Sequence, residues 1–247
     1  MLPYENLKII EYSLEELEVI LDWIRDREKD RDAPATVLIG GWAVDTYSPW
    51  YGSIDIDLVT NRRTKDTLMN YLRKERGYTH YRLPGVSSVA KATPAGKIII
   101  DFASKEGHFP FEGRSEELNF DTLDGHTVEK KLRGKVSVNI PERSLLLLFK
   151  LKACWDREYR IKHGTSHDLE WEQGKLTKDY ADVLSLLDPD HGGRDLNLEF
   201  LGRQFAAFEF LKRCLGNIPD RYDALQKYGR LESEKAKEIV ETLLAII

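Results

Sequence analysis

The chain has 247 residues, enough for one large domain or two small ones with a buried core. Its apolar fraction of 41% and charged fraction of 32% are ordinary for a protein that folds in water. No apolar run approaches the roughly 20 residues that span a bilayer. The net charge of −5 argues against a protein that wraps around nucleic acid.

The cysteines and the first residues indicate a compartment. Cys154 and Cys214 are too few for a disulfide framework or a CxxC zinc site. The opening stretch MLPYENLKII lacks the basic start, sustained apolar core and cleavage site of a signal peptide. We therefore expect a cytoplasmic protein with no membrane partner.

The first half of the chain alternates between helical and extended patterns. Ser13 reads as the N-cap of a helix whose apolar residues run from Leu14 to Ile24. The periodicity then predicts strands and helices in turn. The expected strands are 36–39, 54–60, 78–82, 88–92, 97–102, 127–131 and 135–140, and the expected helices are 42–47 and 64–76.

The pattern of apolar residues changes at Pro141, after which helical spacing dominates. We expect helices at 142–160, 177–187, 198–214 and 233–246. The predicted fold class is α/β (α+β), with a mixed-sheet domain over 1–140 and a helical domain over 141–247.

Two carboxylates stand close together in the second expected strand. Side chains alternate along a strand, so Asp55 and Asp57 point to one side and the intervening Ile56 to the other. Like charges side by side repel, and a divalent cation such as Mg²⁺, which prefers oxygen ligands, would compensate them. The alternative is the solvated polar face of an edge strand.

A third acid and a glycine pair extend the pattern. If the strand at 97–102 neighbours the strand at 54–60, Asp101 brings a third carboxylate, enough for two metal ions. Otherwise Asp101 is a strand-end residue. Gly40-Gly41 lies where a strand meets a helix, where backbone amides can approach phosphate closely, although many such pairs are simple turns. Neither a P-loop nor a dinucleotide fingerprint is present.

The combination of Ile39-Gly40-Gly41, thirteen residues and Asp55-Ile56-Asp57-Leu58 resembles the nucleotidyltransferase superfamily typified by DNA polymerase β. The resemblance implies two bound Mg²⁺ ions, with Mn²⁺ as an alternative, and a nucleoside triphosphate such as ATP. The implied metal ligands are Asp55, Asp57 and Asp101, and the implied nucleotide-binding residues are Gly40, Gly41 and Ser53.

Two branches of that superfamily share further features with the chain. Gly-Gly-Trp-Ala-Val-Asp at 40–45 is similar to the lincosamide and aminoglycoside nucleotidyltransferases. The helical half looks like the abortive-infection toxin nucleotidyltransferases, which implies that Lys150 or Lys152 contacts phosphate and that Asp179 supports the site. Alternatively, one lysine only snorkels, and Asp179 and Asp182 form a solvated stripe.

One position departs from both branches. They usually carry an arginine four residues before the first aspartate, where this chain has Tyr51. The departure puts substrate preference and activity in question. A zinc role for His163 and His167 is the weaker interpretation of the segment HGTSHD.

The resemblance implies transfer of a nucleoside monophosphate to the hydroxyl of an unknown acceptor. The helical half slightly favours RNA or protein as acceptor, in the manner of a toxin with an antitoxin partner. The motif at 40–45 favours a small molecule instead. A non-catalytic nucleotide-binding protein of the same fold, and a purely structural α/β protein, are the remaining alternatives.

Overall fold

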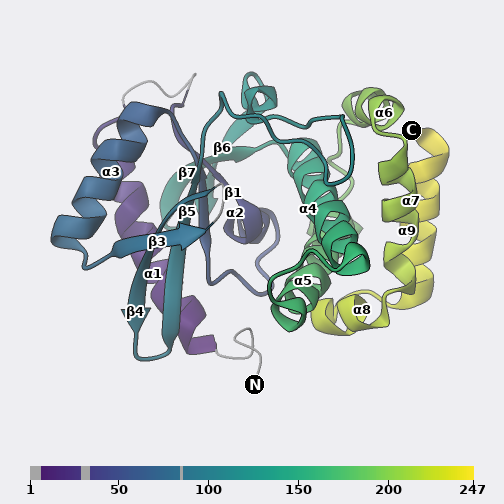
Figure 1. Ribbon diagram of the computed structural model, residues 1–247. Coiled ribbons are helices and arrows are strands. Elements are labelled where there is room, and N and C mark those ends of the chain that lie inside the picture. The colour runs from purple at the N-terminus through teal and green to yellow at the C-terminus, as the bar shows by residue number, and fades with distance from the viewer. Residues whose placement is uncertain (1–6, 29–33, 84–85) are drawn as a thin grey trace. The chain divides into compact units, whose positions relative to one another are not determined.

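The computed structural model describes residues 7–28, 34–83 and 86–247 (Figure 1). Its contacts divide the chain into two compact units. The first unit lies within Met1–Gly107 and Asn119–Pro141, and the second comprises His108–Leu118 and Glu142–Ile247. The chain therefore leaves the first unit, returns to it and leaves it again.

The first unit is built on a five-stranded mixed sheet with the strand order β1-β2-β5-β4-β3. Only β2 and β5 run parallel, and the other neighbours are antiparallel. The sheet strands are β1 (Val37–Ile39), β2 (Ile56–Val59), β3 (Thr79–Leu83), β4 (Val86–Thr93) and β5 (Gly96–Ala103).

Helices and a hairpin complete this unit. The hairpin strands, β6 (Thr127–Leu132) and β7 (Val136–Pro141), pair with each other as a separate antiparallel ribbon. The helices are α1 (Leu7–Arg25), α2 (Gly40–Tyr47), α3 (Arg62–Glu75) and the 3₁₀ turn η2 (Phe120–Leu123).

Burial alternates along the central strands. In β5, Ile98, Ile100 and Phe102 are buried, while the residues between them are partly exposed. The same alternation in β2 buries Ile56 and Leu58. Two-residue periodicity thus sends the apolar side chains to one face of the sheet and the acids to the other.

The second unit is helical. Its elements are α4 (Arg143–His163), α5 (Leu169–Leu187), α6 (Leu198–Ala207), α7 (Phe210–Gly216), α8 (Tyr222–Tyr228) and α9 (Ser233–Ile246), with the 3₁₀ turns η3 (Pro189–His191) and η4 (Ile218–Asp220). Two differences from the sequence-based expectation stand out. The helix expected at 177–187 begins eight residues earlier, and the one expected at 198–214 is two helices broken at Phe208.

The early start of α5 has a local cause. Asp168 caps the helix, because its carboxylate accepts a 3.0 Å hydrogen bond from the amide of Trp171. The first turns are polar. Glu172 is buried there because it forms ion pairs with Arg157 and Arg160, and not because it belongs to an apolar face. Hydrophobic periodicity could not detect this part of the helix.

The segment 108–118 packs within the helical unit. Phe111 is only 1% exposed and contacts the rings of Phe208 and Phe210. The backbone of Glu112 accepts a hydrogen bond from the indole of Trp155 and donates one to Asp156. The simple boundary expected near Pro141 remains a prediction about domains, and this excursion is an additional feature.

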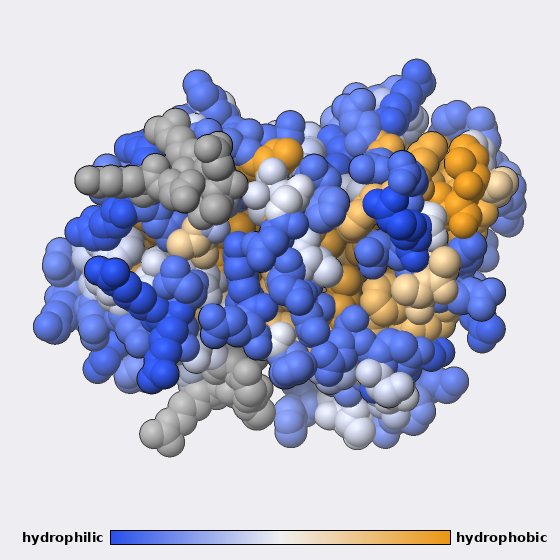
Figure 2. Space-filling model, turned by 90° about the horizontal axis from the view of Figure 1, so that it is seen from above, coloured by the Kyte–Doolittle hydropathy of each residue, from blue (hydrophilic) through white to orange (hydrophobic). Residues whose placement is uncertain are grey.

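The mixed-sheet α/β class followed by helices is confirmed. No helix in the described part of the chain has the length and apolar character needed to cross a membrane. Figure 2 shows a largely hydrophilic face, with hydrophobic residues reaching the surface mainly over the helical unit.

Candidate active site

Two of the three predicted acids lie side by side on the sheet. Asp57 of β2 and Asp101 of β5 are direct partners in the parallel register. Partners on adjacent strands share a face, and neighbouring strands lie about 4.8 Å apart. The strand of Asp101 therefore neighbours the strand of Asp57, which is the condition under which the sequence places Asp101 beside the other acids, and two partly exposed carboxylates share one patch.

Asp101 is oriented from the other side by β4. The hydroxyl of Ser88, its antiparallel partner, donates a short hydrogen bond to Asp101 Oδ1. Ser88 is buried, so this contact fixes the carboxylate instead of competing with bulk water. Asp101 thus has Asp57 on one side and a fixed donor on the other.

The glycine pair faces this patch. Gly40 opens α2 with a left-handed φ of +69°. A Cβ at this position would lie 2.0 Å from Asp57 Oδ2, which only glycine avoids. The backbone at the start of α2 therefore approaches the Asp57 carboxylate more closely than any side-chain-bearing residue would allow.

Gly41 has an equivalent relation to Ser53. A Cβ on Gly41 would meet the Ser53 side chain at 2.9 Å. Since the N-cap Ile39 makes no side-chain cap bond, the first turn of α2 relies on other groups for its amides. The structure thus brings together in space four residues that the sequence singled out: Gly40, Gly41, Ser53 and Asp57.

Asp55 differs from its expected place. β2 begins at Ile56, so Asp55 lies in a bend before the strand and the alternation argument does not apply to it. Among the described residues, no group of three or more His, Cys, Asp or Glu side chains is arranged to hold a metal ion. Mg²⁺ is commonly held by one or two carboxylates with substrate phosphates, and Asp57 with Asp101 fits that donor set.

Side-chain hydrogen bonds and an ion pair hold α2 in place along its length. The indole of Trp42 donates a 3.0 Å hydrogen bond to Ser13 of α1, and the Tyr47 hydroxyl donates one of 2.9 Å to the carbonyl of Pro141. Asp45, fully buried, pairs with Arg133 of the β6–β7 turn. The hydrogen bonds from Arg133 to Asp45 raise the pKa of Arg133, and they outweigh desolvation, which lowers it. Sequence reasoning missed this pair, because its partners are far apart in the chain.

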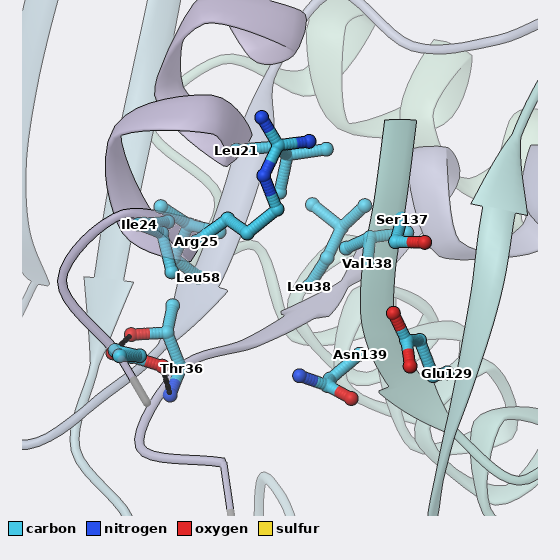
Figure 3. Close-up of a pocket in the computed structure, with 11 residues that line it drawn as sticks. Leu21, Ile24, Arg25, Thr36, Leu38, Leu58, Glu129, Ser137, Val138 and Asn139 are labelled. Carbon is cyan, nitrogen blue, oxygen red and sulfur yellow. Dashed lines mark hydrogen bonds between the residues drawn. The ribbon is translucent and has the colours of Figure 1, made fainter. Parts of the chain in front are cut away.

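A small cavity lies on the opposite face of the sheet. Figure 3 shows it between α1, β1 and the β6–β7 hairpin. Its volume is about 50 Å³. Its apolar lining includes Leu38 and Leu58, which are register partners and alternate with Asp57. At its edge Thr36 binds the Glu28 carboxylate through both its amide and its hydroxyl. The cavity is therefore separate from the acids.

Lys150 lies inside the helical unit. Its ammonium donates a 2.8 Å hydrogen bond to Asp179 and lies 2.7 Å from Asp182 Oδ2, a close ion pair outside hydrogen-bond geometry. Its side chain is 8% exposed. Burial lowers the pKa of Lys150, but the two carboxylates outweigh it and raise the pKa above its ordinary value.

The same cluster continues across α4 and α5. Arg157 bridges Asp179 and Glu172 at 2.8 and 2.6 Å, and Lys178 pairs with Asp182. Because Asp179 and Asp182 are both buried, the alternative of a solvated stripe is wrong. Burial, together with the charge of Lys150, lowers the pKa of Lys178 despite its pairing with Asp182.

The remaining candidates have separate partners. Lys152 Nζ donates to the carbonyl of Pro110 and pairs with Asp156 at 2.6 Å, away from the Lys150 cluster. His163 stacks on Tyr159, whose carbonyl lies 2.8 Å from its ring nitrogen. Tyr51, at the position of the expected arginine, is half-buried and contacts the ring of Trp50.

Comparison with known proteins gives matches at the level of structure alone. The chain matches no protein-family model and no curated protein. Among solved structures, a Thermotoga maritima protein provisionally assigned as a nucleotidyltransferase aligns at 14% identity, over 68% of this chain and 94% of that one, with a TM-score of 0.37. The antibiotic-resistance factor ANT(2'')-Ia aligns at 14% identity, over 79% and 96% of the two chains, with a TM-score of 0.41.

These similarities are too distant to define an activity. Both TM-scores are below 0.5, and identity is 14% in each case. Structural likeness at this level does not carry function from one protein to another. What the chain can do must be derived from its own residues.

Proposed function

We propose that the chain is a metal-dependent nucleotidyltransferase, which moves a nucleoside monophosphate from a nucleoside triphosphate to a hydroxyl group. The observation that carries the proposal is the Asp57–Asp101 pair, with the glycine turn of α2 directly against Asp57. Paired carboxylates and a close backbone approach are what a metal–triphosphate complex requires of a protein.

Each residue has a role in this proposal. The backbone at Gly40 and Gly41 holds the triphosphate, and Ser53 lies beside that turn. Asp57 and Asp101 would hold a divalent cation, Mg²⁺ or Mn²⁺, which neutralises charge on the phosphates. The resemblance to polymerase β adds Asp55 to this set and implies two ions.

The chemistry is a displacement at phosphorus. A new bond forms between the acceptor oxygen and the α-phosphorus, while the bond from that phosphorus to the bridging oxygen breaks and pyrophosphate leaves. The acceptor hydroxyl gives its proton to Asp101, whose carboxylate is held in place by Ser88. Positioning and charge neutralisation supply most of the acceleration in such reactions.

The proposed acceptor is a hydroxyl of RNA or protein, following the resemblance of the helical half to toxin nucleotidyltransferases, with an antitoxin as partner and the cytoplasm as compartment. That resemblance proposes phosphate contacts for Lys150 or Lys152 and a supporting role for Asp179. In the structure, Lys150 and Asp179 are ion-paired with each other within the helical unit. The motif at 40–45 makes a small-molecule acceptor the second candidate.

Label transfer tests the proposal. Purified protein is incubated with labelled nucleoside triphosphate, Mg²⁺ and cell extract, and wild type is compared with Asp57→Asn. The control is Asp66→Asn, an exposed carboxylate on α3. We expect transfer by wild type and the control but not by Asp57→Asn; equal transfer by all three overturns the proposal.

The nature of the acceptor follows from the same product. Loss of label after nuclease treatment identifies RNA, loss after protease treatment identifies protein, and resistance to both identifies a small molecule. Binding of triphosphate by calorimetry without turnover in any extract would identify a non-catalytic nucleotide-binding protein.

A further inference from the structure

Arg133 has an unusual backbone conformation. It lies in the turn between β6 and β7 with φ +46°, and it is the only non-glycine residue with positive φ among those that the structure describes. Side-chain-bearing residues avoid this region because Cβ crowds the following carbonyl. Lys130 and Lys135 of the same hairpin do not share the conformation. Its conformation belongs to the turn, because Arg133 and Gly134 both have positive φ and the Lys135 amide donates a 3.0 Å hydrogen bond to the Leu132 carbonyl, as in the tight turns of hairpins.

The side chain of Arg133 is held by α2. Arg133 Nε donates to Asp45 Oδ2 at 2.9 Å and Nη2 donates to Asp45 Oδ1 at 3.2 Å. Asp45 is fully buried, so the two parallel bonds neutralise a charge that water cannot reach. Removing Arg133 leaves the buried Asp45 carboxylate without its counter-charge, and removing Asp45 leaves the partly buried guanidinium without its own.

The guanidinium also reaches the neighbours of α2. It lies 5.4 Å from the centre of the Trp42 ring. A Cβ on Gly52 would meet Arg133 Nη2 at 3.2 Å and Trp42 at 3.0 Å. Arg133 therefore lies beside Gly52, next to Tyr51, the position at which the resemblance expects an arginine. The guanidinium of Arg133 thus lies near the loop around Gly52, which contains no lysine or arginine of its own.

The position of α2 determines the geometry of the candidate site. Its first residue packs against the Asp57 carboxylate and its second against Ser53. A rotation of the helix would move both contacts together. Tyr47 fixes the far end through Pro141, whereas Asp45 is the one charged residue within α2. The Asp45–Arg133 pair is thus well placed to fix the rotation of the helix.

We infer that Arg133 is a positioning residue, which fixes α2 through Asp45 and so sets the glycine turn against the aspartates. The inference rests on the proposed function, because it assigns the pair to the nucleotide site instead of to stability alone. Arg133 itself need not contact the substrate.

The test compares Asp45→Asn, Arg133→Gln and Arg133→Lys with Glu16→Gln. Glu16 is a matched control, since it is also buried and ion-paired in the first unit, but to Arg76 and Lys91. Four quantities are measured for each variant: the melting temperature, the hydrogen exchange of the α2 amides, and the KM and kcat for nucleoside triphosphate.

We expect all variants to have a lower melting temperature than wild type. Only the Asp45 and Arg133 variants should show faster hydrogen exchange of the α2 amides. These variants should raise the KM for triphosphate about tenfold or more, because small misplacements of binding groups are costly. Arg133→Lys should recover part of the loss, since it keeps the charge but not the two-pronged contact. Glu16→Gln should leave KM unchanged.

The outcomes separate the two claims. Failure of the wild type to bind triphosphate contradicts the proposed function. Binding by the wild type, with KM equal in Asp45→Asn and Glu16→Gln at equal loss of melting temperature, contradicts the positioning role. Unchanged exchange of the α2 amides in both Asp45 and Arg133 variants overturns it by a second route, independent of catalysis.

Discussion

Gly40 shows how much one missing side chain matters. Its positive φ and its contact with Asp57 are separate reasons for glycine, and the chain offers a control that has only the first. Gly77 has φ +75° but open space where a Cβ would lie. Comparing Gly40→Ala with Gly77→Ala therefore isolates the contact from the backbone strain.

We expect Gly77→Ala to lower the free energy of unfolding by about 1–2 kcal/mol, the usual cost of a left-handed alanine. Gly40→Ala should cost at least as much and should also weaken binding of Mg²⁺–triphosphate, because the methyl group displaces the Asp57 carboxylate. Chemical denaturation and calorimetry measure the two effects. Equal binding by both variants would show that the Gly40 contact has no role in the site.

Ser88 provides a second comparison on one strand. Ser88→Ala removes the donor to Asp101, whereas Ser87→Ala changes the neighbouring residue, which pairs with Phe102. We expect each to change stability by about 1 kcal/mol or less. Only Ser88→Ala should reduce the transfer rate at saturating triphosphate. A normal rate in Ser88→Ala would remove Ser88 from the set of supporting residues.

The sequence indicated Asp55, Asp57 and the two glycines because they lie in one short stretch. Spacing placed Asp57 on a strand, and two-residue periodicity put it opposite Ile56. The sequence could not supply Ser88 or Arg133, since contacts with Asp101 and Asp45 arise only from strand pairing and hairpin folding. Asp55 was misplaced because strand ends depend on pairing partners that local patterns do not contain.

At the scale of elements, α4 and α5 are joined by charge as well as by apolar packing. Asp179 accepts from Lys150 and Arg157 at 2.8 Å each. Asp179→Asn would leave both cations without part of their counter-charge, and breaking a buried pair typically costs about 3–5 kcal/mol. We expect a loss of that order in chemical denaturation. Glu238→Gln, which breaks the exposed pair with Lys235, should cost less than about 1 kcal/mol.

The same cluster predicts acid sensitivity. Burial raises the pKa of Asp179, but Lys150 and Arg157 outweigh it and hold the pKa well below its ordinary 3.8. Burial acts on Glu172 in the same sense, and Arg160 and Arg157 lower its pKa below 4.5. A depressed folded-state pKa stabilises the protein above the unfolded value, and this contribution is lost as pH falls below it.

We therefore expect the free energy of unfolding to fall as pH drops from about 5 through 3, and to fall less steeply in Asp179→Asn. Denaturation at a series of pH values measures this slope. A slope unchanged by the substitution would contradict the assigned cause. The alkaline side is less informative, because the raised pKa of Lys150 and the lowered pKa of Lys178 act with opposite signs.

Helix boundaries followed the sequence where apolar periodicity was present. The final helix, Ser233–Ile246, matches the expected 233–246. The first turns of α5 and the whole of α8 were not predicted, because ion pairs and short length conceal them from a periodicity argument. Phe208, at the break between α6 and α7, packs its ring against Phe111, a partner far away in the sequence that local periodicity cannot reveal.

At the scale of the whole molecule, the chain assigns residues 108–118 to the helical unit and 119–141 to the first. The sequence shows one change from mixed to helical patterns, at Pro141. It carries no pattern that would assign residues 108–118 to the helical unit. The excursion has a testable consequence, since Phe111 should support the helical unit and Leu123, after the return, should support the first.

We expect Phe111→Ala to reduce stability by about 3–5 kcal/mol and Leu123→Ala by about 2–5 kcal/mol, as for large-to-small changes in a core. Hydrogen exchange then shows which amides lose protection. Phe111→Ala should expose α4 and α7, and Leu123→Ala should expose the first unit. Loss of protection confined to the first unit in Phe111→Ala would contradict the division.

The central claim is that Asp57 and Asp101 support transfer of a nucleoside monophosphate. The most direct measurement compares triphosphate labelled at the α-phosphorus with triphosphate labelled at the γ-phosphorus, for wild type, Asp57→Asn and Asp101→Asn. We predict that wild type transfers the α-label, releases the γ-label in pyrophosphate, and that both variants transfer neither. Transfer of the γ-label, or α-label transfer undiminished in both variants, would contradict the claim.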